Sequence, residues 1–423
     1  MTDAAAPKPS GSHDVVIVGA GMAGATLALA LSRGGLKCVL IDPQPFEAQA
    51  APGFDGRASA IAYSTFRQWC ALGVAPLLEP HAQRIEQILV TDGRAPGAST
   101  GAPGGAWLRF DAAEIADRAG GEPLGYMLEN RHIRAALARA MAEAEIEVLA
   151  PARVARVEAT GAAAKVMLDG GAVLSAPLVV GADGRESRVR RDAGIGVTGW
   201  DYKQSAIVAT VGVTRDHQGV AYEHFLPSGP FAILPLTGRR VSLVWTESRA
   251  RGTALRAAGD EVFAAHLARR FGDFLGALTV EGPRFVYPLS LQLAERLTGA
   301  RTALVGDAGH AIHPIAGQGL NMGLKDAAAL AEVVIDALRL GEDYGSTAVL
   351  ERYARWRSVD NIGVAAATDL FVRLFSSDNP LARAARGLGL RAVNRIGPAR
   401  RFFMSEAGGA VGDLPRLLRG QAL

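Results

Sequence analysis

The chain has 423 residues, of which 49% are hydrophobic and 21% charged, and its formal net charge is +3. This composition is typical of a globular protein with two or three domain-sized cores, and no membrane span is needed to explain it. The two cysteines, Cys38 and Cys70, form no CxxC pair. A disulfide framework and a zinc site are therefore not indicated, no metal is expected, and a reducing cytoplasm fits.

The amino-terminal part predicts a disordered leader followed by a βαβ unit. Residues 1–12 are rich in Ala, Pro and Ser, which favours disorder. Residues 15–18 are a short apolar run that predicts a strand, residues 24–34 predict its helix, and residues 37–41 predict a second parallel strand ending at Asp42.

The turn inside this unit carries the pattern GxGxxG at Gly19, Gly21 and Gly24. In such a turn the first glycine allows the bend, the second lets the backbone approach a pyrophosphate, and the third lets helix and strand pack closely. Asp42 follows at a distance suited to ribose hydroxyl groups. NAD and FAD would satisfy this unit equally well. Residues 194–199 match the same pattern, but they follow charged residues and lead into no amphipathic helix.

The next part of the chain mixes strands with one clear helix. Residues 86–90 predict a strand, and the Gly/Pro/Ala-rich residues 93–105 predict an irregular surface insertion. Helical periodicity returns at residues 130–143. The apolar residues 178–180 are expected to rejoin the first sheet.

The second half begins with short strands and ends in helices. Residues 206–213, 221–226, 231–236 and 241–245 predict a separate antiparallel sheet. A helix near 260–270 and a strand at 284–288 follow, and residues 302–305 return the chain to the nucleotide-binding fold. From residue 325 onward the pattern is mostly helical.

Two further glycine-rich segments follow apolar runs, at residues 181–190 and 304–324. Three separated backbone approaches to one ligand imply a large, extended cofactor. The two segments resemble the paired motifs of the flavoprotein aromatic hydroxylases, which implies FAD. In that family the late acid, here Asp307, holds the ribityl chain, and the helix start from Gly317 to Asn321 meets the flavin pyrimidine edge. The positive end of a helix suits the negative charge of a reduced flavin.

The resemblance is closest to the ubiquinone-biosynthesis hydroxylases of that group. It rests on GRASA at 56–60, LGYMLENR at 124–131, YEHFLPSGPFAILPL at 222–236 and HPIAGQGLN at 313–321. The resemblance implies an α/β fold: a discontinuous Rossmann-like FAD-binding domain, an antiparallel β-sheet substrate domain and a helical C-terminal segment. The cofactor-binding residues so expected are Gly19, Gly21, Gly24, Asp42, Arg57, Arg131, Asp183, Gly184, Asp307, Pro314, Gly317, Gln318, Gly319, Leu320 and Asn321.

The domain boundaries expected from these patterns are discontinuous. The FAD-binding domain takes residues 13–80, 126–195 and 297–340, the substrate domain takes 81–125 and 196–296, and residues 341–423 form the C-terminal helical region. On the substrate side we expect Phe225, Pro227, Phe231, Leu234 and Pro235.

The resemblance implies a monooxygenase that hydroxylates the aromatic ring of a polyprenylated phenol in ubiquinone biosynthesis. NAD(P)H would be the transient electron donor, and a flavin C4a-hydroperoxide formed with O2 would be the reactive group, so no catalytic side chain is assigned. His310 and His313 flank the flavin segment, and we interpret both as structural. Hydroxylation of a small soluble phenol and a non-catalytic flavin-bearing subunit of a biosynthetic assembly remain as alternatives.

The carboxyl-terminal residues 371–423 combine nine arginines with large apolar side chains. Such a composition suits an amphipathic surface at an anionic bilayer, and equally a helical cap that packs on the other domains. A cytoplasmic protein, with peripheral attachment to the inner membrane or contact with other ubiquinone-biosynthesis proteins as open possibilities, fits both interpretations. No nucleic acid is expected, because the arginines lack an accompanying binding motif. The sequence indicates no oligomeric state.

Overall fold

The computed structural model describes residues 12–45, 56–92, 107–226, 228–314, 317–375, 408–409 and 412–423. The expectations for the leader before residue 12, the loop at 93–105, Pro227 and residues 376–407 and 410–411 of the C-terminal region lie outside these residues. Within the described part, no helix combines the length and apolar character needed to cross a membrane.

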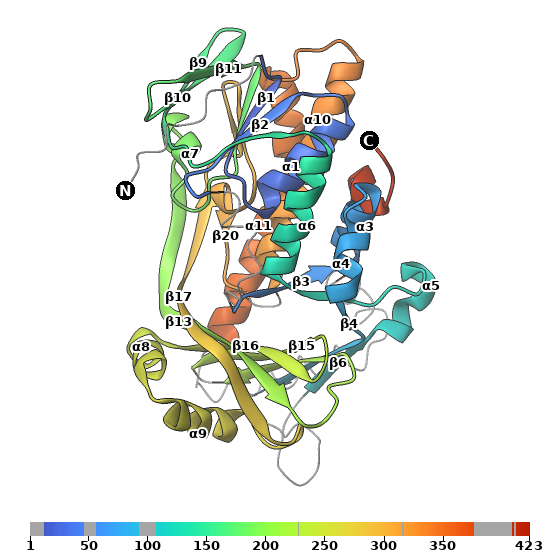
Figure 1. The fold of residues 1–423 in the computed structure, drawn as a ribbon, viewed down its shortest axis with the longest axis vertical. Helices are drawn as coiled ribbons and strands as arrows, with labels where there is room; N and C mark the ends of the chain where they lie inside the picture. Colours follow the sequence, from blue (N-terminus) through green and yellow to red (C-terminus); the bar gives the residue numbers. More distant parts are fainter. Residues whose placement is uncertain are drawn as a thin grey trace.

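A six-stranded sheet forms the upper half of the molecule (Figure 1), with the order β18-β19-β12-β1-β2-β8. All its strand pairs are parallel except β18 with β19. Strands β1, β2 and β12 are apolar and fully buried, as expected for a parallel sheet covered on both faces. The strands are β1 (Val15–Val18), β2 (Cys38–Ile41), β8 (Glu147–Leu149), β12 (Leu178–Gly181), β18 (Thr298–Gly299) and β19 (Thr302–Leu304).

Helices and a small sheet cover the two faces of this parallel sheet. Helices α1 (Met22–Arg33), α6 (Asn130–Glu143) and α10 (Gln318–Arg339) pack on the face that carries Val15 and Ile17. The antiparallel strands β9 (Val154–Thr160), β10 (Ala163–Leu168) and β11 (Val173–Ala176) pack on the face that carries Val16 and Val18. The return of residues 178–180 and 302–305 to the first sheet is thereby confirmed.

An eight-stranded sheet forms the lower half, with the order β20-β17-β13-β16-β15-β14-β5-β6. It is antiparallel except for one parallel pair, β14 with β5. The expected antiparallel arrangement of residues 206–213, 221–226, 231–236 and 241–245 is confirmed. Helices α8 (Arg249–Ala257) and α9 (Asp260–Phe271) cover one face. The strands are β5 (Gln87–Asp92), β6 (Trp107–Asp111), β13 (Val197–Val213), β14 (Val220–Leu226), β15 (Gly229–Leu236), β16 (Arg240–Ser248), β17 (Leu278–Ala294) and β20 (His310–Ala311).

Strands β13 and β17 are longer than the sequence pattern predicts, with 17 residues each. They run as a paired ribbon between the two halves of the molecule (Figure 1). The glycine pattern at 194–199 leads into β13 rather than into a helix, as expected. The ribbon therefore ties the eight-stranded sheet to the region of the parallel sheet.

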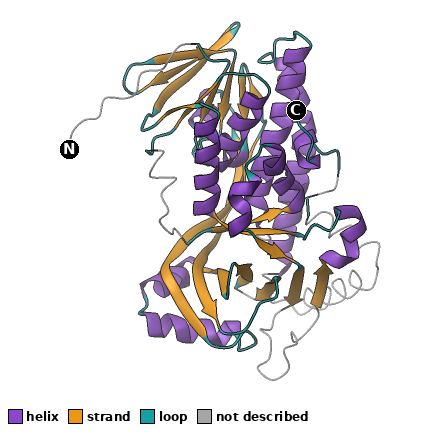
Figure 2. Ribbon diagram, turned by 45° about the vertical axis from the view of Figure 1, so that its right-hand side comes forward, coloured by secondary structure: helices purple, strands orange, loops and turns teal. Residues whose placement is uncertain are grey.

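A third, three-stranded sheet lies between these two halves, with the order β3-β7-β4 (Figure 2). It contains β3 (Ala58–Ala62), β4 (Gln83–Ile85) and β7 (Gly125–Glu129). The remaining elements are α3 (Tyr63–Ala71), α4 (Ala75–Leu78), η1 (Glu79–His81), η2 (Ala112–Ile115), α5 (Ala116–Ala119), α7 (Arg188–Asp192), η3 (Gly306–Ala308), α11 (Thr347–Phe375) and η5 (Arg416–Arg419).

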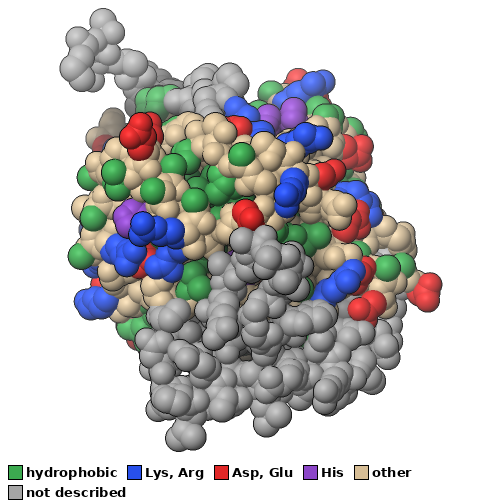
Figure 3. Space-filling view, turned by 90° about the horizontal axis from the view of Figure 1, so that it is seen from below, with side chains coloured by type: hydrophobic (Ala, Val, Ile, Leu, Met, Phe, Trp, Pro, Cys, Tyr) green, Lys and Arg blue, Asp and Glu red, His purple; other side chains and the backbone are tan. Residues whose placement is uncertain are grey.

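The face seen from below carries basic and acidic side chains interspersed, rather than gathered into one patch of a single sign (Figure 3).

Candidate cofactor and substrate site

The first glycine turn is built so that each glycine has a different requirement. Gly19 has φ +108, and a Cβ there would lie 2.3 Å from the Ala182 carbonyl oxygen. A Cβ at Gly24 would lie 2.1 Å from the Gly19 carbonyl oxygen, whereas a Cβ at Gly21 would meet nothing within 4 Å. The fold itself therefore requires Gly19 and Gly24, and Gly21 faces open space at the start of α1.

The amino end of α1 has no side-chain cap and no acidic residue in its first turn, so its first backbone N–H groups have no partner within the helix. Asp42 lies beside it at the end of β2. Its Oδ2 accepts a hydrogen bond from Ala20 N at 2.9 Å, and its Oδ1 accepts one from Gln44 N at 2.9 Å. Two backbone donors thus fix the carboxylate next to the turn, where an extended anionic cofactor would lie.

The second segment follows β12 and touches the first turn directly. Ala182 N donates to Val18 O at 2.7 Å. Asp183 Oδ2 accepts from Arg188 N at 2.6 Å and from Val189 N at 3.3 Å, so this carboxylate caps α7. Its Oδ1 is buried and has no hydrogen-bond partner in the described part of the chain. The expected contact of Asp183 with the cofactor therefore stays a prediction, and one oxygen is available for it.

Gly184 and Asp307 lie on neighbouring loops, and both are more accessible than the first glycine turn. Gly184 has φ +77, and a Cβ there would meet no atom within 4 Å. The exposed Asp307 carboxylate lies 3.8 Å from Arg185 Nε of the second segment. Residue 306 meets the start of α1 and α10, since a Cβ at Gly306 would lie 3.6 Å from Ala23 Cβ and 3.7 Å from Gly323 Cα. The three glycine-rich segments thus converge on one region.

Helix α10 begins at this point and is fastened to β3. Gly317, with φ +64, precedes it, and a Cβ there would lie 3.0 Å from Ala60 Cβ. The Asn321 side chain accepts from Ala62 N at 2.9 Å and donates to Ala60 O at 2.7 Å and to Gly317 O at 3.0 Å. Position 319 is open, with nothing within 4 Å, and the first turn has no acidic residue and no side-chain cap.

Gln318 and Leu320, in the same turn, are half-buried, as is Pro314, whose carbonyl oxygen accepts from Gly317 N at 3.1 Å. The backbone N–H groups at the start of α10 are therefore available to an electron-rich ligand edge. The open start of α1 and the open start of α10 fit the diphosphate and the isoalloxazine ring of FAD, respectively.

The two arginines predicted near the cofactor have protein partners. The exposed Arg57 places its guanidinium 6.0 Å from the centre of the Tyr287 ring. Arg131 Nε donates to Glu129 Oε2 at 2.7 Å, and Arg240 donates to the other oxygen of Glu129 at 2.6 Å. Burial alone would raise the pKa of Glu129, but these two arginines lower it overall. Arg240 thus joins β7 to the eight-stranded sheet through Glu129, while Arg131 of α6 pairs with the same carboxylate. The contact of Arg131 with FAD stays a prediction.

His310 belongs to a buried polar network that the sequence pattern did not reveal. It donates from Nε2 to Asp326 Oδ2, which also accepts from Gly306 N at 3.1 Å. Arg357 Nε donates to Asp326 Oδ1 at 2.9 Å. Burial would raise the pKa of Asp326, but His310 and Arg357 lower it to about 2. The one signal in the sequence was Asp326, an acid beside the alanine-rich run of α10. Its partner Arg357 is 31 residues away on α11, so the sequence did not show the pairing.

His313 has a different environment. It is 1% exposed, and neither ring nitrogen has a hydrogen-bond partner among the described residues. Its ring meets the edge of Tyr202 at a centroid distance of 5.3 Å. Burial lowers the pKa of His313 to about 4, so the imidazole is neutral at physiological pH.

The residues expected on the substrate side divide between two faces of the eight-stranded sheet, because side chains alternate along a strand. Leu234 packs with Ala58 and Ala60 of β3, on the face nearer the start of α10. Phe231 is 0% exposed and packs edge-on to Trp245, in the core under α9.

Strand alternation also places Phe225 on the same face as Leu234, and Pro235 on the same face as Phe231. We call the face that carries Leu234 the inner face, and the face covered by α8 and α9 the outer face. Phe231 and Pro235 therefore support the sheet from its outer face and do not point toward the flavin segments, which corrects their expected placement.

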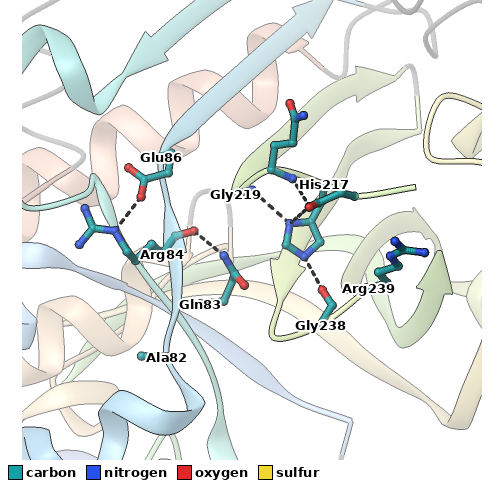
Figure 4. A pocket seen from close by; sticks show the side chains of 10 residues that line it. Ala82, Gln83, Arg84, Glu86, His217, Gly219, Gly238 and Arg239 are labelled. Atoms are coloured by element: carbon teal, nitrogen blue, oxygen red, sulfur yellow. Dashed lines mark hydrogen bonds and ion pairs between the residues drawn. The ribbon is translucent and has the colours of Figure 1, made fainter. Parts of the chain in front are cut away.

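A separate hollow of about 550 Å³ lies at the turns of the sheet, lined by residues 82–84, 86, 216–219 and 238–239 (Figure 4). Several of its polar groups already form hydrogen bonds or ion pairs within the protein. His217 Nε2 lies 2.9 Å from the carbonyl oxygens of Leu236 and Gly238, and Arg84 pairs with Glu86 at 2.6 Å. Nothing in this hollow matches the chemistry of the flavin segments.

Comparison with known proteins agrees with this architecture. The family profile described as FAD binding domain matches residues 12–360. Ubiquinone hydroxylase UbiL of Rhodospirillum rubrum is 46% identical over 97% of this chain and 93% of its own length. The 3-demethoxyubiquinol 3-hydroxylase of Escherichia coli is 36% identical over 93% of this chain and 98% of its own length.

Among solved structures, p-nitrophenol 4-monooxygenase PnpA from Pseudomonas putida has the same fold, with a TM-score of 0.75 at 20% identity over 93% of this chain and 97% of that one. The chain belongs to the FAD-dependent aromatic monooxygenase family that includes these ubiquinone hydroxylases. FAD is its cofactor.

Proposed function

We propose that the chain hydroxylates the aromatic ring of a polyprenylated phenol in ubiquinone biosynthesis, using FAD, O2 and NAD(P)H. The observation that carries this proposal is the open start of α10, fastened by Asn321 to β3 and facing the inner face of the eight-stranded sheet. Together with the 46% identity to a ubiquinone hydroxylase, it supports a flavin held between a glycine-rich helix start and an apolar sheet face.

The bound flavin supplies the chemistry that activates O2. The chain itself positions the cofactor and the substrate. The start of α1 holds the diphosphate, with Asp42 beside the ribose, and backbone N–H groups of α10 stabilise negative charge on the flavin edge. Half-buried apolar side chains of the inner face, such as Leu234, receive the aromatic ring and keep water away from it.

The test uses the purified FAD-loaded protein with a polyprenylated phenol. We expect NAD(P)H oxidation that depends on the phenol and a product heavier by one oxygen atom, which mass spectrometry with ¹⁸O2 detects. A short hydroxybenzoate serves as the matched substrate control. Turnover of the hydroxybenzoate without any response to the prenylated phenol would reject the proposed substrate class. A yellow protein that oxidises no NAD(P)H with either phenol would reject the catalytic role.

We also infer that the chain meets its apolar substrate at a membrane surface. Helix α11 carries Val359, Ile362 and Leu370 on one face, and their exposed fractions are 76%, 60% and 64%. Such exposed apolar side chains on one side of a helix favour contact with lipid or with another protein.

Flotation with anionic phospholipid vesicles tests this inference. The wild-type protein should float, and the combined Val359→Ser, Ile362→Ser and Leu370→Ser variant should float much less. Val262→Ser on α9 is the matched control, since Val262 is also exposed, at 53%. Equal flotation of the triple variant and wild type would contradict a role for this face. Binding to a second ubiquinone-biosynthesis protein without any flotation would assign substrate delivery to that partner instead.

A further inference from the structure

Glu223 lies on β14 and points to the inner face of the eight-stranded sheet. Its neighbours Tyr222 and His224 belong to the outer face, where His224 stacks against Phe231 at a centroid distance of 6.4 Å. Ala221, two residues away on the same strand, packs with Met127 and other residues of the inner side. Strand alternation therefore places the Glu223 carboxyl group on the side of β3 and the start of α10.

The Glu223 side chain is buried and has no partner among the described residues. The residue is 9% exposed, and no described residue forms a hydrogen bond or ion pair with its side chain. Its cross-strand neighbours are Ala232 and Val90, which are both apolar. Burial alone raises the pKa of Glu223 to about 8.

The other acids that are buried in the described part of the chain are paired. Glu129 binds Arg131 and Arg240, Glu247 binds Arg270, and Asp326 binds Arg357. Burying a carboxyl group without a hydrogen-bond partner lowers the stability of the folded protein by several kcal/mol. Glu223 therefore stands apart as a polar group that is placed on the inner face without serving the packing of the chain.

The inner face beside Glu223 is only partly covered by the chain. A continuous row of cross-strand neighbours runs from Glu223 through Ala232, Val244 and Val208 to Phe285. Val244 and Phe285 in this row are half-buried and apolar. Accessible apolar surface next to a buried carboxyl group matches a ligand that has an apolar body and a single polar group.

The far end of the row reaches the segment just before β3. A Cβ at Gly56 would lie 2.2 Å from the Phe285 ring, so that ring lies directly against this segment. On the same face, the hydroxyl groups of Thr210 and Thr246 are buried and lack partners among the described residues. Several polar atoms on this face thus have no hydrogen-bond partner among the described residues.

We propose that the Glu223 carboxyl group hydrogen-bonds the hydroxyl group of the phenolic substrate, while the row from Ala232 to Phe285 packs against its ring and prenyl chain. This inference rests on the proposed function and names the residue that selects a phenol over an equally apolar ring without a hydroxyl group. Glu223 is thus a substrate-binding residue that determines specificity.

The test compares binding of 2-geranylphenol and its methyl ether, 2-geranylanisole, to the FAD-loaded protein by isothermal titration calorimetry. The methyl ether cannot donate a hydrogen bond. The wild-type protein should prefer the phenol about five- to tenfold, the size expected for one hydrogen bond. Glu223→Leu should bring this ratio to about one, and Glu223→Gln, whose amide oxygen still accepts a hydrogen bond, should retain most of it.

Tyr222→Phe is the matched control, because it removes a hydroxyl group from the same strand on the outer face, and the ratio should not change. If Glu223→Leu does not fold or load FAD, Glu223→Met takes its place as an unbranched apolar residue of similar length. A wild-type ratio near one, or an unchanged ratio in the apolar variant, overturns the proposal.

These results are independent of turnover. A binding ratio that depends on Glu223 in a protein that produces no hydroxylated phenol rejects the proposed function and leaves the binding site. Turnover of the prenylated phenol with a binding ratio insensitive to residue 223 rejects the role of Glu223 and leaves the proposed function.

Discussion

At the scale of single residues, similar side chains in this chain have unlike environments. His310 donates to Asp326 within a packed network, whereas His313, three residues later, has no hydrogen-bond partner among the described residues. The sequence showed both histidines beside the flavin segment, but hydrogen-bond partners come from distant parts of the chain and could not be assigned. For the same reason, the pairing of Arg131 with Glu129 and the capping of α7 by Asp183 became visible only in three dimensions.

The glycines of the first turn give the first residue-scale prediction. Gly24→Ala places a Cβ 2.1 Å from the Gly19 carbonyl oxygen, so the backbone must shift. Overpacking of this kind typically costs about 1–3 kcal/mol, and the better helix propensity of alanine offsets up to about 1 kcal/mol of it. Urea unfolding of the FAD-free protein should show a clear loss of stability.

Gly21→Ala is the matched comparison, because its Cβ meets no protein atom within 4 Å. Its unfolding free energy should stay within about 1 kcal/mol of wild type. Its affinity for FAD should fall at least about tenfold, since the new methyl group occupies the space through which a pyrophosphate approaches the helix start. Fluorescence titration measures this affinity. Wild-type FAD binding by Gly21→Ala would show that the diphosphate does not lie at this glycine.

At the scale of elements, helices α10 and α11 are joined by buried charge as well as by apolar packing. Arg357 on α11 reaches Asp326 on α10, and Asp326 in turn holds Gly306 N and His310. Tyr353 of α11 donates to Leu304 O at 2.6 Å. The loop that carries Asp307 therefore owes its position to two helices behind it, and not to its own short 3₁₀ turn.

Arg357→Met is predicted to be strongly destabilising, because it leaves the buried Asp326 carboxylate without its cation. Removing one partner of a buried pair typically costs about 3–5 kcal/mol. Arg355→Met, two residues away on the same helix, changes an exposed arginine and should alter stability by less than about 0.5 kcal/mol. Thermal and urea unfolding compare the two variants. Equal stabilities would show that His310 and Gly306 N suffice to hold the Asp326 charge.

Regular elements with a strong local pattern were predictable, and those whose form depends on a partner were not. Residues 15–18 and 178–180 are continuous apolar runs, residues 130–143 carry helical periodicity, and each forms the expected element. Strand β17 extends well beyond its apolar centre at 284–288, because pairing with β13 holds its polar outer residues in extended form. The sheet β3-β7-β4 was not predicted, because its strands lack a continuous apolar run and pair with segments far away in the sequence.

At the scale of the whole molecule, the site lies between the six-stranded parallel sheet, which carries the cofactor segments, and the eight-stranded sheet, which we propose carries the substrate. The parallel pairing of β5 with β14 joins residues 87–92 to 220–225, and no local pattern specifies such a partner. Glu129, on the small middle sheet, receives Arg240 from the eight-stranded sheet. The relation of the two sheets is thus held by a long strand ribbon and by ion pairs between distant segments.

The strand order of the parallel sheet also has a consequence for how the protein is made. Strand β1 is synthesised first, but it lies between β2 and β12, and β12 in turn needs β19, which ends at residue 304. During translation an apolar strand edge therefore stays unpaired until most of the polypeptide has left the ribosome, a situation that favours aggregation and chaperone capture. Cofactor loading must be later still, because α10 begins only at residue 318.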